Sequence, residues 1–162
     1  MEQENIYSQV GKAVKKIALK LFENKELLKL LQDMSDDPFN NVTFKVDNTL
    51  DFKNGNIRTI PNVDTTKVKQ GIIVVIPYYG MTGENSQFSL SGFSFDIFLP
   101  IDKWQINNEI QRPYEIMSKI YNLVNNSRVT GIGVLRHDGF ELDVVSNEVS
   151  LHSVKFTVDT VG

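Results

Sequence analysis

At 162 residues, of which 41% are hydrophobic and 23% charged, the chain has an ordinary globular composition and enough length for one domain with a sizeable core. The 17 Lys and Arg and the 20 Asp and Glu give a formal net charge of -3, which excludes a general electrostatic attraction to nucleic acid or anionic membranes. Cysteine is absent, which excludes disulfides and thiolate metal sites and favours assembly inside a cell.

The start of the chain predicts neither export nor membrane insertion. The residues Met1-Glu2-Gln3-Glu4 lack the basic start and the apolar core of a secretory signal. The longest uninterrupted apolar run, Ile72 to Ile76, is far shorter than the roughly 20 residues that span a bilayer.

An amphipathic helix is predicted near the N-terminus. Its apolar residues recur at intervals of three and four, at Ile6, Val10, Ala13, Ile17 and Leu21. A second apolar set, 27–31, follows Asn24, and Asp36-Asp37-Pro38 stops the pattern. We therefore expect helix from about residue 4 to 33, in one or two pieces.

The region from Pro38 to Gln70 is predicted to be the least regular part of the chain. It is rich in Asn, Asp, Thr and Lys, and Asn54-Gly55 is a turn signal. Alternation over 42–46 predicts a short strand, and Ile57 with Ile60 predicts another. The remainder, about 47–70, is expected to be a long exposed loop insertion that serves contacts.

Two strands joined by a polar turn are predicted next. The β-branched run 71–79 is typical of a strand covered on both faces, and 88–99 alternates, with a change of inward face near Gly92 that indicates a bulge or bend. We expect an antiparallel hairpin across the turn at 80–87.

The C-terminal third is predicted to contain a helix and three strands. Pro113 suits the first turn of a helix over about 112–125. Strands are expected at 131–135, 140–144 and 149–158, with turns at 137–139 and 146–148 that make a three-stranded meander. The order of elements predicts a single α+β domain over 1–162, with the two helical regions flanking a mainly antiparallel sheet.

No pattern in the sequence predicts catalysis or a metal site. His137 and His152 lie in different predicted elements, and Asp36-Asp37 lacks the spacing of a calcium loop. The carboxylates Asp96, Glu141 and Asp143 alternate with apolar residues, as on the solvated face of a strand. Gly131-Ile132-Gly133 precedes a strand and not a helix, so it is not a phosphate-binding loop. We expect no enzyme activity and no cofactor.

Two features could serve contacts. Trp104, the only tryptophan, is expected either to cover the core or to anchor an interface. The first helix carries a basic face, for which a solvated surface is favoured and the charged lumen of an oligomer is the alternative. That face consists of Lys12, Lys15, Lys16 and Lys20.

The order of elements, and 99–121 above all, resembles the tail-terminator or tail-completion (neck) proteins of long-tailed bacteriophages. The resemblance extends over most of the chain. This chain departs from the family pattern by an extended insertion between Pro38 and Gln70. The segments that carry it are Leu27-Leu28-Lys29-Leu30-Leu31 followed by Asp37-Pro38, Asp96-Ile97-Phe98-Leu99, Asp102-Lys103-Trp104, Arg112-Pro113-Tyr114, Arg128-Val129-Thr130-Gly131-Ile132-Gly133, and a final hairpin.

The resemblance implies a virion structural subunit without catalytic residues. Such subunits form a ring, typically a hexamer, that caps the tail tube and offers a surface to the head connector. It implies assembly in the host cytoplasm, a place in the tail or neck of the virion, and DNA that passes through the lumen without sequence-specific binding. The interface candidates are Trp104, Arg112, Tyr78, Tyr79, Asn54 and Arg58.

Other functions stay open on the sequence alone. Within structural proteins, the alternative is a head-tail connector or stopper subunit. From other classes, the alternatives are a small enzyme whose site is assembled from scattered carboxylates and a non-viral binding module.

Overall fold

The computed structural model describes residues 5–82 and 87–159. Its elements in chain order are α1 (Ile6–Phe22), α2 (Lys25–Gln32), β1 (Ile57–Arg58), β2 (Ile72–Thr82), β3 (Gln87–Pro100), a short 3-10 helix (Ile101–Lys103), β4 (Gln105–Ile106), β5 (Ile110–Gln111), α3 (Arg112–Val124), β6 (Arg128–Val129), β7 (Gly133–Val144) and β8 (Val149–Asp159).

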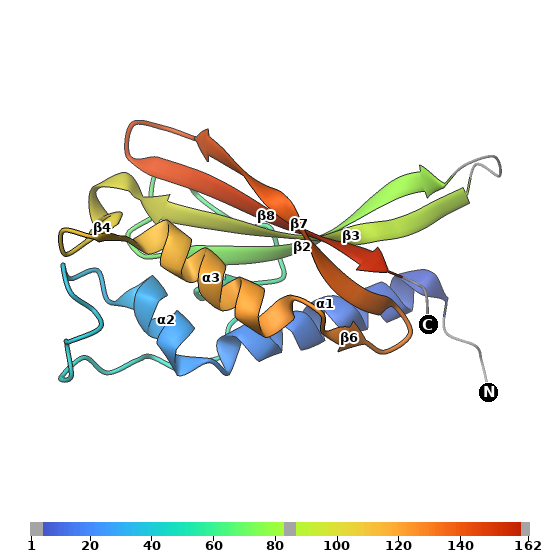
Figure 1. Ribbon diagram of the computed structural model, residues 1–162, viewed down its shortest axis with the longest axis horizontal. Helices are drawn as coiled ribbons and strands as arrows, with labels where there is room; N and C mark the ends of the chain where they lie inside the picture. Colours follow the sequence, from blue (N-terminus) through green and yellow to red (C-terminus); the bar gives the residue numbers. More distant parts are fainter. Residues whose placement is uncertain (1–4, 83–86, 160–162) are drawn as a thin grey trace.

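A six-stranded sheet, in the order β1-β2-β3-β8-β7-β6, forms one layer of the molecule, and the three helices form the other (Figure 1). Strands β1 and β2 are parallel, and all other neighbours in this sheet are antiparallel. Strands β4 and β5 pair separately. The predicted α+β class with a mainly antiparallel sheet is confirmed.

The N-terminal helical region consists of two helices. Asn24 separates them, and its side-chain oxygen accepts a hydrogen bond of 2.9 Å from the amide of Leu27, which caps α2. The prediction of helix over about 4–33 is therefore confirmed in its two-piece form.

The core lies between the helices and one face of the sheet. Phe93, Phe95 and Ile97 of β3 are fully buried there, against apolar residues of α1 and α2. Neighbouring strands align, so Phe156 of β8 pairs with Phe93 and makes an edge-to-face contact with Phe95 at 5.5 Å. The strand period of two thus gives one uninterrupted apolar face.

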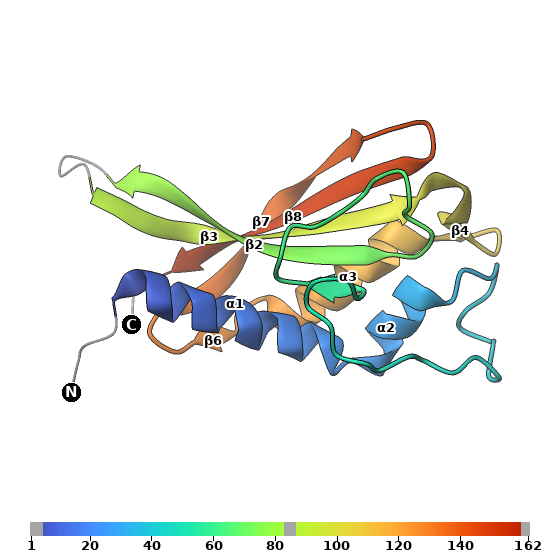
Figure 2. The ribbon, with the colours of Figure 1, turned by 180° about the vertical axis from the view of Figure 1, so that it is seen from behind.

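The opposite face of the sheet carries a smaller apolar cluster. Val68, from the segment before β2, is buried there with Ile72 and Val74. Figure 2 shows this connecting segment crossing the outer face of the sheet. Val68 is the buried residue of 59–70, whose other side chains are exposed or half-buried, so this segment is fastened to the sheet at Val68 and is otherwise largely exposed, as expected.

No strand forms at 42–46 and Ile60 lies outside β1, so those parts of the strand prediction are wrong, while Ile57 is in β1 as expected. The segment is held by α2 side chains instead. The side chain of Gln32 donates a hydrogen bond of 2.7 Å to the carbonyl of Asp47 and accepts one of 2.8 Å from the amide of the same residue. Lys29 donates 2.8 Å to the carbonyl of Asn41. These contacts hold the backbone on either side of 42–46, at Asn41 and Asp47.

The bulge predicted near Gly92 is present. The register between β2 and β3 shifts after Tyr78, which pairs with Gly92. A Cβ at Gly92 would lie 2.0 Å from the carbonyl oxygen of Phe156 and 2.6 Å from the hydroxyl oxygen of Tyr78, so the two strands and the tyrosine ring require glycine here. The hairpin is confirmed, while part of its turn, 83–86, lies outside the described residues.

The predicted three-stranded meander is wrong. Its first two strands are one strand, β7, and the expected turn at His137-Asp138-Gly139 is a bulge within it. Gly139 has φ +130, which a residue with a side chain rarely adopts, and the extra residue bends the strand without reversing it. The turn at 146–148 joins β7 to β8 as predicted.

Candidate assembly surface

Strand β7 forms an open edge of the sheet in its second half. Its partner β6 pairs only with Gly133 and Val134, and no other described strand pairs with the outer side of β7. The amide of Val145 donates a hydrogen bond of 3.0 Å to the carbonyl of Val149. In an antiparallel pair every second residue bonds its partner strand, so the backbone groups of Phe140, Leu142 and Val144 point away from β8. These groups are able to bond a partner chain.

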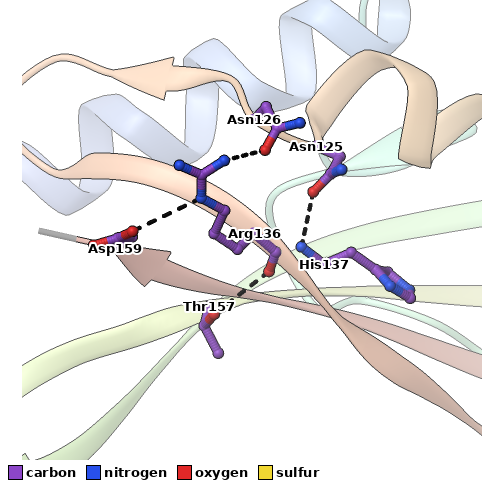
Figure 3. A network of polar contacts seen from close by, with 6 residues as sticks. All are labelled: Asn125, Asn126, Arg136, His137, Thr157 and Asp159. Atoms are coloured by element: carbon purple, nitrogen blue, oxygen red, sulfur yellow. Dashed lines mark hydrogen bonds and ion pairs between the residues drawn. The ribbon is translucent and has the colours of Figure 1, made fainter. Parts of the chain in front are cut away.

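The first half of the same edge is closed by a polar network (Figure 3). The side-chain oxygen of Asn125 accepts a hydrogen bond of 2.9 Å from the amide of His137. The side-chain oxygen of Asn126 accepts a hydrogen bond from the guanidinium of Arg136. Arg136 also lies 3.7 Å from the carboxylate of Asp159. The bulge at 137–139 is thus the boundary between a closed and an open part of β7.

Apolar side chains line the open part. Phe140, Leu142 and Val144 are exposed to 49%, 47% and 57%. Their cross-strand partners are Val154, His152 and Ser150, which face the helices, so the three side chains lie on the helix side of the sheet. Tyr114 of α3, 42% exposed, extends this stripe through an edge-to-face contact with Phe140 at 6.2 Å. Contiguous exposed apolar surface at a strand edge is typical of a protein contact.

The other face of the same segment is acidic. Glu141 and Asp143 alternate with the apolar stripe and are exposed, as is Asp138 in the bulge. Glu141 lies 3.7 Å from Lys155 of β8, and both side chains are solvated. The open edge of β7 therefore combines an apolar side and an acidic side.

A polar groove of about 320 Å³ lies at the other edge of the sheet, beside β1. Three cations, Arg58, Lys67 and Lys69, line it together with one carboxylate, Asp47, and the amides of Asn54 and Gln70. Arg58 is held in place by donating to the backbone carbonyls of Gly55, at 2.7 Å, Asn54, at 3.0 Å, and Asn62. Partial burial lowers the pKa of Arg58 from its usual value, and nearby Asp51 opposes that change. Asn54 and Arg58, both predicted as contact residues, thus share one groove.

Trp104 covers the core. Its indole NH donates 2.9 Å to the hydroxyl of Ser150, and its ring lies 5.1 Å from that of His152. Tyr114 closes the other side of His152 at 5.9 Å. His152 is fully buried, neither ring nitrogen has a hydrogen-bond partner, and desolvation lowers its pKa. This aromatic group supports the open part of β7 from beneath, because His152 pairs with Leu142.

Arg112 is fully buried and so is not available to a partner. Its guanidinium donates to the carbonyls of Leu30, at 2.8 Å, Ser35, at 2.9 Å, and Lys103, at 2.8 Å. Burial lowers its pKa, and the carboxylates of Asp33 and Asp36 act in the opposite direction. This residue joins α3 to α2 and to the segment before β4, a structural role that the sequence does not reveal.

The remaining predicted residues lie in separate places. Tyr78 is half-buried, with a pKa raised first by burial and then by Asp138, and its hydroxyl group lies over Gly92. The side chain of Tyr79 lies outside the described part. The four lysines of α1, which are Lys12, Lys15, Lys16 and Lys20, are all exposed. They form one basic helix surface, and none of them lines the groove beside β1.

The sequence analysis missed the apolar stripe of β7. Its alternation with Glu141 and Asp143 is the ordinary pattern of a strand with one buried face. Only the position of β7 at the edge, beyond the reach of most of α3, leaves that face exposed. In the described part of the chain, no group of three or more His, Asp or Glu residues could hold a metal ion, and no helix is long and apolar enough to cross a bilayer.

Comparison with known proteins gives one finding. A family model described as YomW matches residues 24–157, which begins at the cap of α2 and extends almost to the end of β8. No curated protein and no solved structure matches.

Proposed function

The chain belongs to the YomW family, and we propose that it is a virion structural protein, not an enzyme, whose copies form a ring of about six subunits. This ring caps a phage tail tube and joins it to the head connector. Assembly takes place in the host cytoplasm, without a cofactor, and DNA passes through the lumen.

The observation that carries the proposal is the open edge of β7. A ring requires that each subunit present two different surfaces, because a head-to-tail contact closes only when one patch meets another. Phe140, Leu142 and Val144 combine unpaired backbone groups with exposed apolar side chains, a combination that invites a further chain. Trp104 lies beneath this surface, bonded to Ser150 of β8, whereas Arg112 is buried elsewhere, against α2 and the segment before β4.

The basic surface of α1 supplies a reason to place DNA in the lumen. Four exposed lysines on one helix favour phosphate without reading sequence, since such contacts act through charge. In this arrangement the overall charge of -3 keeps the outer surface from binding nucleic acid.

The experiment is the solution mass of the purified full chain by light scattering, alone and with tail tubes from the same source. We expect a mass about six times the 18.4 kDa of one chain, or recruitment of the chain to tube ends that negative-stain images reveal. A strict monomer that ignores tube ends would refute the proposal and direct attention to ligand screening for a binding module or an enzyme.

A further inference from the structure

The two edges of the sheet differ in charge as well as in shape. The β7 edge carries Asp138, Glu141 and Asp143, all exposed. The groove beside β1 is lined by three cations, Arg58, Lys67 and Lys69, against one carboxylate, Asp47, so its lining is basic on balance. These surfaces lie toward opposite sides of one sheet, because strands β2, β3 and β8 separate β1 from β7. A contact between them within one chain is therefore impossible.

We propose that the acidic open edge of β7 in one copy docks in the basic groove beside β1 in the next copy. This inference rests on the proposed ring and names the two surfaces that close it. Because the two surfaces are different and lie at opposite edges, the contact is head-to-tail and generates a ring when its rotation closes.

Charge disfavours the simplest competing arrangement, a two-fold pairing of β7 with β7 of a second copy about Leu142. Antiparallel pairing about Leu142 would place Glu141 directly opposite Asp143 of the other copy, twice in the same interface. Like charges directly opposite each other on paired strands are destabilising. The groove instead offers cations to both carboxylates, and such complementarity selects partner and register.

The polar groups of the groove also match the backbone of the open edge. Asn54 and Gln70 line the groove and carry amides that both donate and accept hydrogen bonds. They suit the outward backbone groups of Phe140 and Leu142, which need a donor and an acceptor in turn. The apolar stripe then packs at the rim of the contact, on the helix side of the sheet.

Charge reversal tests the pairing. Asp143→Lys and Lys69→Glu, each measured alone by sedimentation, are expected to weaken self-association by about tenfold, since each places like charges together. Both residues are exposed and lie outside the core, so the folded chain tolerates the changes. Glu109→Lys, in the exposed turn between β4 and β5, is the matched control and leaves association unchanged.

The mixture of the two single variants gives the sharper result. Equal amounts of Asp143→Lys and Lys69→Glu chains should associate as strongly as the unchanged chain, because the introduced lysine of one variant meets the introduced glutamate of the other and the remaining contacts are unaltered. A two-fold contact through β7 gives no such recovery and would overturn the pairing. Recovery with Lys16→Glu in place of Lys69→Glu would move the partner surface to α1 and overturn the assignment.

Different outcomes refute the ring and the pairing of β7 with the groove beside β1. Rings of unchanged chain that neither reversal weakens would overturn this pairing and leave the ring intact. An unchanged chain that stays monomeric refutes the ring itself and this pairing with it. Stronger self-association of Asp143→Lys alone would point to the β7-β7 contact and also overturn the inference.

Discussion

Replacement of Arg112 by Ala should destabilise the fold. It should not remove a contact between copies, because Arg112 is buried inside the chain. The guanidinium is fully buried and donates to the carbonyls of Leu30, Ser35 and Lys103 at 2.8 to 2.9 Å. A hydrogen bond from a charged donor contributes about 1.5 kcal/mol or more, so the loss of three bonds predicts a fall of about 4.5 kcal/mol or more in the free energy of unfolding. A domain of this size has about 5 to 15 kcal/mol in total, so the variant should fold marginally.

The assay is urea unfolding followed by circular dichroism, with Arg136→Ala as the control. Arg136 is exposed and contacts Asn126 and Asp159, so its loss should cost less than about 1 kcal/mol. Arg112→Lys should fall between the two, because an ammonium group cannot reproduce the fork of a guanidinium. If Arg112→Ala lowered stability by less than about 1 kcal/mol while it abolished association, Arg112 would be an interface residue after all and the reasoning from burial would be refuted.

Three further variants test separate parts of the structure. Gly92→Ala should lower the free energy of unfolding by about 1 to 3 kcal/mol in urea, because its Cβ would overlap the β8 backbone, whereas Gly11→Ala, with open space around its Cβ, should stabilise slightly. Burial lowers the pKa of His152, so the unfolded chain binds a proton at this residue more readily than the folded chain does. The free energy of unfolding should therefore fall as the pH drops below about 6.5, by up to about 1.4 kcal/mol per pH unit. His152→Phe should remove this pH dependence in melts recorded over a series of pH values. Gln32→Ala should release the segment near Asp47 to limited proteolysis while the far-UV spectrum stays unchanged, and protection equal to that of the parent chain would contradict the role of Gln32.

The elements that the sequence predicted are those in which a local pattern coincides with packing. The periods of α1 and α3, the possible break near Asn24 and the bulge near Gly92 are all local signals, and the structure confirms them. The strand predicted over 42–46 does not form. Long-range bonds from Lys29 and Gln32, which no local pattern reveals, hold the chain at its two ends, Asn41 and Asp47. Gly139 was interpreted as a turn residue because glycine with a positive φ is common both in turns and in bulges.

The candidate surface was less predictable than the fold. Asn54 and Arg58 were expected at contacts and do line one groove, but the cations that complete it, Lys67 and Lys69, come from the loop after β1. The apolar face of β7 looks buried in the sequence, and only the strand order makes it an edge. Arg112 looked like a surface anchor because a buried arginine with three carbonyl partners requires tertiary structure to recognise.

In the proposed assembly, copies of this chain associate head-to-tail through two different edges of one sheet. Negative-stain class averages of the purified full chain test it most directly, since they reveal symmetry as well as size. We expect closed rings of about six subunits, each of 18.4 kDa. Two-fold dimers, or single particles with the mass of one chain at every concentration, would contradict it.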